Sequence, residues 1–320
     1  MPEPAPLVGP DLIGRRVTVR HQIVDDTHSS SDVVGRVLDA DDTAILLERR
    51  DGSLARVRAG DVLLLRVVPD RPTRSRPAAA ISEEDLTRVT SRGWPATESV
   101  PLGAWELRAA AAFTGRANSV AVHGDPGTST TEALHAVVAF YESRGLPPLA
   151  QVVVDSDWEG RFIDAGWEPL TSYRGGAIVQ VADLGAAPEP DPRVTFRANV
   201  TDSWLARYER VADAAAARAV LEGPRTVAFA ELEQDGSTVA VGRIVVTGEW
   251  AGVAAVETDP AHRRRGLARA VVTSSLAWAY DRGATKAYLQ TMPTNDAALA
   301  LYEPFGFVTH HAYRYLRPGD

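Results

Sequence analysis

VAAVETDPAHRRRGLARA, residues 253–270, is the stretch that decides how the second half of the chain folds. It reads as an apolar strand, a turn at Asp259-Pro260 and the start of an alanine-rich helix predicted over residues 267–281. The first turn of a helix carries backbone N–H groups without partners inside the helix, and the macrodipole adds positive charge there. Gly266 permits close backbone approach, and the three arginines before it add forked cationic donors. The stretch therefore predicts an anion-binding site suited to phosphate groups.

A second motif, NDAALALYEPFGF, occupies residues 295–307. Arg263, Gly266 and Ala268 of the first stretch also match the pattern Arg/Gln-x-x-Gly-x-Gly/Ala. The two motifs together resemble those of the GNAT superfamily, the Gcn5-related N-acetyltransferases. The rival interpretation is an ordinary α/β unit with a glycine-containing turn.

The resemblance implies direct transfer of an acetyl group from the cosubstrate acetyl-CoA to a primary amine. It implies that the pantetheine arm bonds to backbone groups of Val256 and Thr258 and contacts Asn295. It also implies that the pyrophosphate lies on the N–H groups of the loop and the first helical turn. The remaining residues expected to bind the cofactor are Arg263, Arg264, Arg265, Gly266, Leu267, Ala268 and Arg269.

Acyl transfer to an amine requires a base, an oxyanion donor and an acid that reprotonates the thiolate. The resemblance puts Tyr302 near the sulfur, where a tyrosine can act as general acid; the alternative is an aromatic packing residue. Many relatives carry a glutamate on the strand before the loop, but residues 250–255 contain no carboxylate. Glu257 is the nearest acid and the candidate base, although it also fits a solvent-facing strand position. Glu231, Glu249, a water chain or an amine of low pKa are the alternatives.

The composition is that of a globular protein, with 320 residues of which 45% are hydrophobic. The absence of cysteine rules out disulfides, zinc thiolate sites and a cysteine nucleophile, and no metal is expected. A net charge of −8 argues against nucleic acid as a partner. No apolar run is long enough for a membrane helix, and the acidic, proline-rich residues 1–6 are not typical of a signal peptide. These features predict a cytoplasmic enzyme.

The N-terminal residues 1–70 are predicted to form a small β-barrel of SH3-like or Tudor-like type. Five short strands are expected at residues 16–24, 33–39, 44–48, 54–57 and 62–67, and Asp51-Gly52 signals a hairpin between the third and fourth. The region contains no Trp, Tyr or Phe that could bind a partner, so a scaffold role is favoured over ligand binding. Residues 71–80 are predicted to be a linker.

Residues 81–186 are predicted to form a degenerate GNAT-like domain without a cofactor loop. The helix, strand and short helix over residues 130–167 echo those over residues 267–307. In the first copy, residues 124–127 carry no arginine where the second has its loop, and Phe162 stands in place of Tyr302. This domain is expected to bind no acetyl-CoA and to wall the acceptor site. The alternative is that two α/β segments merely share the same succession of elements.

The polar stretch Arg116-Ala117-Asn118-Ser119 permits two interpretations. It could line the acceptor site, or it could be a solvated turn with local hydrogen bonds.

The predicted fold class is therefore α/β (α+β): an N-terminal barrel followed by two GNAT-like mixed-sheet domains in tandem, the catalytic one at residues 191–320. The architecture resembles an actinobacterial group of tandem GNAT proteins. Mycothiol synthase-like activity is one alternative, and a non-catalytic acyl-CoA-binding regulator is another. The acceptor is expected to be a small-molecule or protein amine, and the protein a monomer or homodimer without membrane association.

Overall fold

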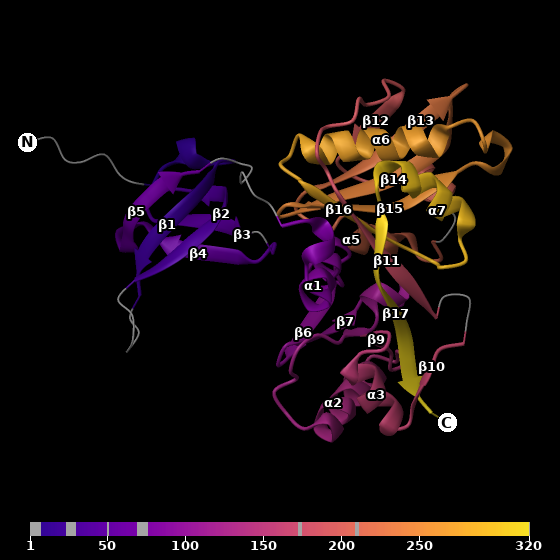
Figure 1. The fold of residues 1–320 in the computed structure, drawn as a ribbon, viewed down its shortest axis with the longest axis horizontal. Coiled ribbons are helices and arrows are strands. Elements are labelled where there is room, and N and C mark those ends of the chain that lie inside the picture. The colour runs from indigo at the N-terminus through magenta and orange to yellow at the C-terminus, as the bar shows by residue number, and fades with distance from the viewer. Residues whose placement is uncertain are drawn as a thin grey trace, which may run out of the picture. The chain divides into compact units, whose positions relative to one another are not determined.

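The computed structural model describes residues 8–23, 30–49, 51–68, 76–171, 175–208 and 211–319. The chain divides into two compact units: residues 1–75 together with 247–249, and residues 76–246 together with 250–320 (Figure 1). Each unit is described by itself. The first half of the predicted linker at residues 71–80 lies outside the described residues; in the second half, Ala78–Ala80 forms a 3-10 turn.

The N-terminal unit is a five-stranded antiparallel sheet with the order β4-β3-β2-β1-β5. Its strands are β1 (Arg16–Gln22), β2 (Ser30–Ala40), β3 (Ala44–Arg49), β4 (Leu54–Arg58) and β5 (Val62–Val67). Alternate residues of these strands are buried in one apolar core, as in Val17, Val19 and Leu47. The five predicted strands are confirmed. A closed barrel is not seen in the described part of the unit, because the sheet ends at β4 and β5.

The hairpin predicted at Asp51-Gly52 is present between β3 and β4. Gly52 has a φ of 79°, a left-handed conformation that glycine adopts without steric cost. Its backbone N–H donates to the carbonyl of Arg49, and Asp51 Oδ1 accepts from the backbone N–H of Ser53. The turn therefore fixes the register of the two strands.

The larger unit is built on one long mixed sheet with the order β12-β13-β14-β15-β16-β11-β17-β9-β8-β7-β6, and β10 pairs with β17 off this path. From residue 76 to 190 the strands are β6 (Glu98–Leu102), β7 (Trp105–Ala109), β8 (Val120–Ala121), β9 (Ala150–Val153), β10 (Trp167–Pro169) and β11 (Gly176–Asp183). Beyond residue 190 they are β12 (Val194–Arg197), β13 (Val227–Gln234), β14 (Ser237–Thr247), β15 (Trp250–Thr258), β16 (Lys286–Thr291) and β17 (Val308–Pro318). The sequence analysis did not predict β6 or β10.

Seven α-helices belong to the described part of this unit. They are α1 (Glu83–Gly93), α2 (Thr130–Glu142), α3 (Asp157–Asp164), α4 (Asp202–Tyr208), α5 (Ala214–Leu221), α6 (Leu267–Tyr280) and α7 (Asp296–Tyr302). Figure 1 shows α2 and α3 at one end of the sheet and α6 and α7 at the other. Ser82 caps α1, since its side chain accepts from the backbone N–H of Asp85. Helix α2 begins at Thr130, and Ser129 is its N-cap residue.

Two strands join the halves of this sheet. Strand β11 precedes residue 186, yet it pairs antiparallel with both β16 and β17. The long strand β17 pairs with β11 over Val308–Arg314 and with β9 over Tyr313–Leu316, and in Figure 1 it runs from the middle of the unit toward the end that holds α2 and α3. The C-terminal strand therefore carries side chains of the second half into contact with the first.

The echo seen in the sequence has a counterpart in the topology. In the first half β8 pairs in parallel with β9, with α2 between them in the chain. In the second half β15 pairs in parallel with β16, with α6 between them. Each of these parallel pairs is followed by a short helix, α3 in the first half and α7 in the second.

Candidate active site

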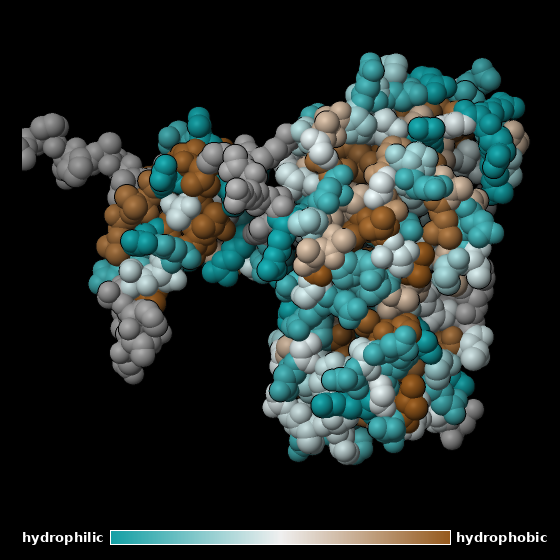
Figure 2. All heavy atoms as spheres, viewed as in Figure 1, coloured by the Kyte–Doolittle hydropathy of each residue, from teal (hydrophilic) through white to brown (hydrophobic). Residues whose placement is uncertain are grey.

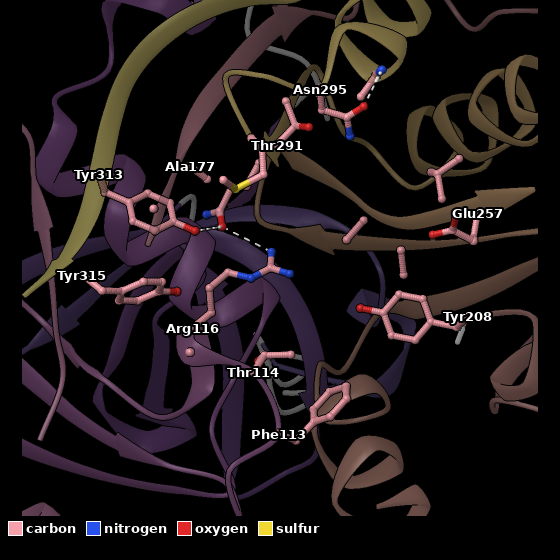
Figure 3. Close-up of a pocket in the computed structure, with 18 of the residues that line it drawn as sticks. Phe113, Thr114, Arg116, Ala177, Tyr208, Glu257, Thr291, Asn295, Tyr313 and Tyr315 are labelled. Atoms are coloured by element: carbon pink, nitrogen blue, oxygen red, sulfur yellow. Dashed lines mark hydrogen bonds between the residues drawn. The ribbon is translucent and has the colours of Figure 1, made fainter. Parts of the chain in front are cut away.

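A cavity of about 650 Å³ lies where β15 and β16 end. Its walls come from β15, from the segment between β16 and α7, from α7 itself, and from the loop at residues 111–116 of the first half. Figure 3 shows side chains from all these segments converging on one space. The cavity is therefore formed by both halves of the larger unit.

The cavity exists because two neighbouring strands separate. The parallel pairing of β15 with β16 covers only Trp250–Val253 and Lys286–Leu289. Ala255 then adopts a φ of 52°, a left-handed conformation that is strained for a residue with a Cβ atom. The rest of β15 diverges from β16, and residues 254–258 are all partly exposed. Irregular backbone at this point opens the edge of β15 to a ligand.

The predicted contact residues of β15 lie in this open segment. Val256 and Glu257 both line the cavity. Thr258 does not line it, but its Oγ1 atom is buried and has no hydrogen-bond partner among the described residues. A buried hydroxyl without a partner is costly, so this atom is suited to bind a polar group of a ligand.

The predicted phosphate loop follows directly. Asp259 is tied to the strand end, because its side chain accepts from the backbone N–H of Ala261 and pairs with Arg207 at 2.9 Å. Arg264 and Gly266 have φ values of 64° and 75°, so the chain turns sharply into α6. The cationic side chains of this loop and of the first helical turn are exposed: Arg263, Arg264, Arg265 and Arg269.

The start of α6 has no side-chain cap. Gly266 is its N-cap residue, and no side chain accepts a hydrogen bond from the first turn. Leu267 is buried and Ala268 partly buried, so the helix is anchored by its apolar face. A Cβ atom added at Gly266 would meet nothing within 4 Å. The first-turn N–H groups therefore face open space beside the arginines.

Asn295 and Tyr302 occupy the two ends of α7, and both line the cavity. Asn295 is the N-cap residue, and its Oδ1 accepts from the backbone N–H of Ala298 at 3.2 Å (Figure 3). Tyr302 is 7% exposed and packs against Phe307. Burial raises the pKa of the Tyr302 hydroxyl above its usual value. The hydroxyl therefore keeps its proton at neutral pH, and the raised pKa makes it a weaker acid than an exposed tyrosine.

Two carboxylates line the cavity among the described residues, Glu257 and Asp213. The Glu257 side chain is 24% exposed, and its Oε1 lies 4.0 Å from Nη2 of Arg263. Asp213 caps α5 by accepting from the backbone N–H groups of Ala215 and Ala216; the sequence analysis had not singled it out. The alternative bases Glu231 and Glu249 are not among the lining residues, and Glu231 Oε1 accepts a hydrogen bond from Thr201.

Several lining residues were not predicted at all. They are aromatic or polar side chains from the loop of the first half, from α4, from β16 and from β17: Phe113, Tyr208, Gln290, Tyr313 and Tyr315. Arg116, from the polar stretch of the first half, also points into the cavity (Figure 3). Tyr313 and Tyr315 are two residues apart on β17, so the two side chains lie on the same face of the strand. That this face lines the cavity follows only from the pairing of β17 with β11 and β9.

The other polar residues of that stretch have a structural role. Asn118 is 9% exposed, and its Oδ1 accepts from the backbone N–H groups of Ala110 and Ala112. Its Nδ2 donates to the carbonyls of Phe113 and Thr114. The predicted local hydrogen bonds of Asn118 are therefore confirmed, but its predicted exposure to solvent is wrong, because the side chain is buried.

No group of three His, Cys, Asp or Glu side chains in the described part of the chain could hold a metal ion. Across the same residues, no helix combines the length and the apolar character needed to cross a membrane. His310 and His311 contact each other through their Nδ1 atoms at 2.8 Å, and Nε2 of His310 lies 3.0 Å from the carbonyl oxygen of Ile81.

A family model described as "Probable histone acetyltransferase Rv0428c C-terminal" matches residues 82–316. Over 311 residues the chain is 31% identical to "Probable histone acetyltransferase Rv0428c" of Mycobacterium tuberculosis, and the match covers 95% of each protein. It is 26% identical over 247 residues to "Uncharacterized N-acetyltransferase YobR" of Bacillus subtilis, covering 72% of this chain and 98% of that protein.

Two solved structures show the same fold. A GCN5-related N-acetyltransferase from Kribbella flavida superposes with a TM-score of 0.55 at 18% identity, covering 73% of this chain and 95% of that one. A tandem GNAT protein from the clavulanic acid biosynthesis pathway gives a TM-score of 0.52 at 14% identity, covering 78% and 92%. The family model and the relative matched along nearly its whole length show that this chain is a member of the Rv0428c C-terminal family within the GNAT superfamily of N-acetyltransferases.

Proposed function

We propose that this GNAT-family acetyltransferase moves an acetyl group from acetyl-CoA to a primary amine by direct transfer. The observation that carries the proposal is the opening between β15 and β16, which leads to the uncapped N-terminus of α6. A strand edge and a helix start in succession offer backbone donors first to an extended amide-bearing chain and then to phosphates. The strand edge is therefore the proposed place of the pantetheine arm of acetyl-CoA, and the helix start is the proposed place of its pyrophosphate.

The residues present fit acetyl-CoA. The uncapped first turn of α6 has unsatisfied backbone N–H groups that a polar ligand would complete. We assign the pantetheine arm to Val256, Thr258 and Asn295. The pyrophosphate is assigned to the loop and first turn, at Arg263, Arg264, Arg265, Gly266, Leu267, Ala268 and Arg269.

When bound, acetyl-CoA supplies an activated acetyl thioester. The hydroxyl of Tyr302 is protonated and lines the cavity, so it is the proposed general acid. Glu257 lines the same cavity and is the proposed acceptor of the proton from the amine. A backbone N–H of β15 beyond Val253 is the proposed donor to the oxyanion, where one such donor is worth about 3 kcal/mol.

The first half is proposed to be a degenerate GNAT-like domain, at residues 81–186, that walls the acceptor side and binds no cosubstrate. The N-terminus of α2 is closed by its own capping box, in which the Ser129 and Glu132 side chains satisfy each other's backbone N–H groups. Glu132 also adds negative charge to the first turn. An anion therefore gains little at α2, whereas the loop at residues 111–116 of this half lines the cavity.

The N-terminal unit is proposed to be an SH3-like scaffold rather than a second binding module. Residues 11–68 contain no Trp, Tyr or Phe. Figure 2 shows hydrophobic residues on the surface of this unit, and its exposed apolar side chains include Ile13, Val34, Leu54, Leu63, Leu64 and Val67. Aliphatic surface of this kind favours packing over recognition of a charged partner.

The test is release of CoA from acetyl-CoA in the presence of a panel of amines, for the native protein and for Tyr302→Phe. Turnover of at least one amine, falling sharply in Tyr302→Phe with an unchanged melting temperature, is expected. An upward thermal shift with acetyl-CoA but no turnover of any amine would instead support a non-catalytic acyl-CoA-binding regulator. An absent thermal shift would contradict the assigned cosubstrate.

A further inference from the structure

Arg116 is the one arginine whose side chain lines the cavity among the described residues. Its Nη1 donates to Oε1 of Gln290 at 3.2 Å, and its guanidinium carbon lies 4.0 Å from the centre of the Trp94 ring. No carboxylate of the described chain forms an ion pair with it. A guanidinium has five N–H donors, so most of its capacity to bind an anion is available to a ligand.

The loop that holds Arg116 is firmly built. The four hydrogen bonds of Asn118 fix residues 110–114, and Trp94 Nε1 donates to Thr114 Oγ1 at 3.0 Å. A Cβ atom added at Gly115 would lie only 3.0 Å from the Tyr315 ring. The backbone reaches this shape through left-handed φ values at Ala111, Ala112 and Thr114, and strain of this kind persists where the surroundings enforce it. The guanidinium is thus presented in a defined place.

A second arginine adds to the positive charge at this side of the cavity. Arg243 is 1% exposed, its guanidinium carbon lies 4.8 Å from the same Trp94 ring, and its nitrogens donate to the carbonyls of Leu221 and Gly93. Its Nη2 atom is buried with no partner among the described residues. Arg116, Arg243 and Gln290 also share a small void beneath the cavity. Two buried or half-buried cations without a counter-carboxylate are unfavourable alone, so an anion bound to Arg116 in the cavity would also lower the electrostatic cost of the Arg243 charge.

The charges in the cavity are separated. Arg116 stands beside Tyr313 and Tyr315, whereas Glu257 stands beside Tyr208 on the other side (Figure 3). Asp213, the second carboxylate, also lines the cavity. An ammonium group is attracted to the carboxylates, and an anion to the arginine. An acceptor that carries an ammonium group and an anionic group would therefore complement both the carboxylates and Arg116.

We propose that the acceptor is an amine that carries its own carboxylate, with the carboxylate bound by Arg116 and the amine directed toward Glu257. The proposal rests on the proposed function and names its substrate class. An arginine binds a carboxylate through two parallel hydrogen bonds, while the rings of Phe113, Tyr313 and Tyr315 border the path between the two charges. A lysine-rich protein segment would meet Arg116 as a like charge.

The experiment uses pairs of amines that differ only in the carboxylate. α-Amino acids, β-alanine and γ-aminobutyrate, each alongside its amide, cover a range of separations between amine and carboxylate. CoA release is measured for each pair in the full-length protein. For the member with the best fit, the acid is expected to have a kcat/KM about 10- to 100-fold above that of its amide, the value of a charge-assisted hydrogen-bond pair.

Arg116→Gln and Arg116→Lys test whether the arginine is responsible. In Arg116→Gln the preference for the acid is expected to vanish because kcat/KM falls far more for the acid than for the amide, and Arg116→Lys is expected to restore part of the preference. A purely structural role would lower both members of the pair together. Arg161→Gln is the matched control, because Arg161 also lies over a tryptophan, Trp158 at 4.6 Å, but outside the cavity.

A binding measurement separates this proposal from the proposed function. Calorimetry without acetyl-CoA is expected to show the N-acetyl derivative of the best acid binding about 10- to 100-fold more tightly than its amide, with the difference lost in Arg116→Gln. Turnover of lysine peptides but of no acid, or equal turnover of acids and amides, would overturn the acceptor class and leave the acetyltransferase assignment intact. Absence of turnover with every amine, including peptides, would overturn both.

Discussion

The N-termini of α2 and α6 occupy corresponding positions in the two halves of the larger unit, and they differ in almost every chemical respect. The first turn of α2 is satisfied by Ser129 and carries Glu132. The first turn of α6 follows Gly266, lacks a side-chain cap and carries no acidic residue. Both helices connect a pair of parallel strands, β8 to β9 and β15 to β16. The shared topology shows that the strand–helix arrangement alone does not make an anion site; the residues at the helix start do.

A second difference concerns the strands that flank these helices. In the second half, pairing of β15 with β16 stops at Val253 and a cavity opens beyond it. In the first half, Arg108 of β7 is a buried side chain, bonded to Ser91, Ser119 and Gln151. Its guanidinium is thus satisfied within the first half, whereas the cavity in the second half is open to a ligand.

The largest expected effect comes from making the start of α6 acidic. Gly266→Glu puts a negative charge where the proposed pyrophosphate binds, so the affinity for acetyl-CoA should fall by about 1,000-fold. Calorimetry with acetyl-CoA measures the affinity of the native protein and of the variant.

Gly266→Ala is the control for backbone strain, because a Cβ atom there meets open space but the φ of 75° costs about 1 kcal/mol. Its affinity should be reduced far less than that of Gly266→Glu. Unchanged binding in Gly266→Glu would show that α6 is no more an anion site than α2.

The next largest effect is expected on kcat, from a substitution at Tyr302. Phe162 occupies the equivalent position in the similar segment of the first half. Tyr302→Phe makes the second half resemble the first at this position. If Tyr302 is the general acid, kcat should fall about 100-fold while the Kd of acetyl-CoA stays the same. Steady-state kinetics and calorimetry provide the two readouts, and an unaltered kcat would reduce Tyr302 to a packing residue.

Each half of the larger unit contains a buried histidine, His123 in the first and His311 in the second, that should make stability depend on pH. Burial lowers the pKa of His123 to about 4, assisted by the positive charge of Arg88, and burial beside His310 lowers that of His311 to about 4. Both are therefore neutral in the folded protein, while in the unfolded chain they bind protons below a pKa of about 6.5. The unfolding free energy should thus be highest above pH 6.5 and fall as the pH drops toward 4, by on the order of 2 kcal/mol for each histidine.

Urea unfolding between pH 7 and pH 4.5 checks this dependence. His123→Gln and His311→Gln should each flatten the pH profile, because glutamine does not titrate. A profile as steep in the double variant as in the native protein would refute the assignment.

The smallest expected effect is on the capped helix. Ser129→Ala removes the cap of α2, in which Ser129 Oγ accepts from the backbone N–H of Glu132 at 3.3 Å. The free energy of unfolding should fall by about 1 kcal/mol, with no change in the affinity for acetyl-CoA. Thermal unfolding with and without acetyl-CoA measures both quantities, and a weakened affinity would indicate that α2 contributes to binding.

The sequence predicted the strongly patterned elements well. The strand predicted before the turn at Asp259-Pro260 is present as β15, and α6 ends one residue earlier than expected. Local rules suffice there, because a strong apolar pattern and a glycine turn act within a few residues of each other. Strand β6 was missed, since its residues are exposed or half-exposed and include Pro101, so no alternation marks it. Strand β10 has only three residues.

The candidate site was predicted only on its cosubstrate side. Val256, Glu257, Asn295 and Tyr302 were named from the motifs, and all four line the cavity. Tyr313, Tyr315 and Gln290 were not, because nothing near them in the chain distinguishes a cavity-lining tyrosine or glutamine from one in a core. One of two interpretations of the polar stretch put Arg116 at the acceptor site, and Arg116 does line the cavity, but its partner Gln290 lies far from it in the sequence.

What the sequence determined by itself was the chemistry of short segments. The arginines, glycine and small residues at 263–268 define a helix start that an anion can approach, and the capping residues Ser129 and Glu132 define one that it cannot. What only the tertiary structure decided was the acceptor side. The insertion of β11 between β16 and β17, and the pairing of β17 with β9, bring Tyr313, Tyr315 and Arg116 to the open edge of β15. Pairing between strands distant in sequence depends on the whole sheet and its packing, so no local pattern could reveal which side chains would meet there.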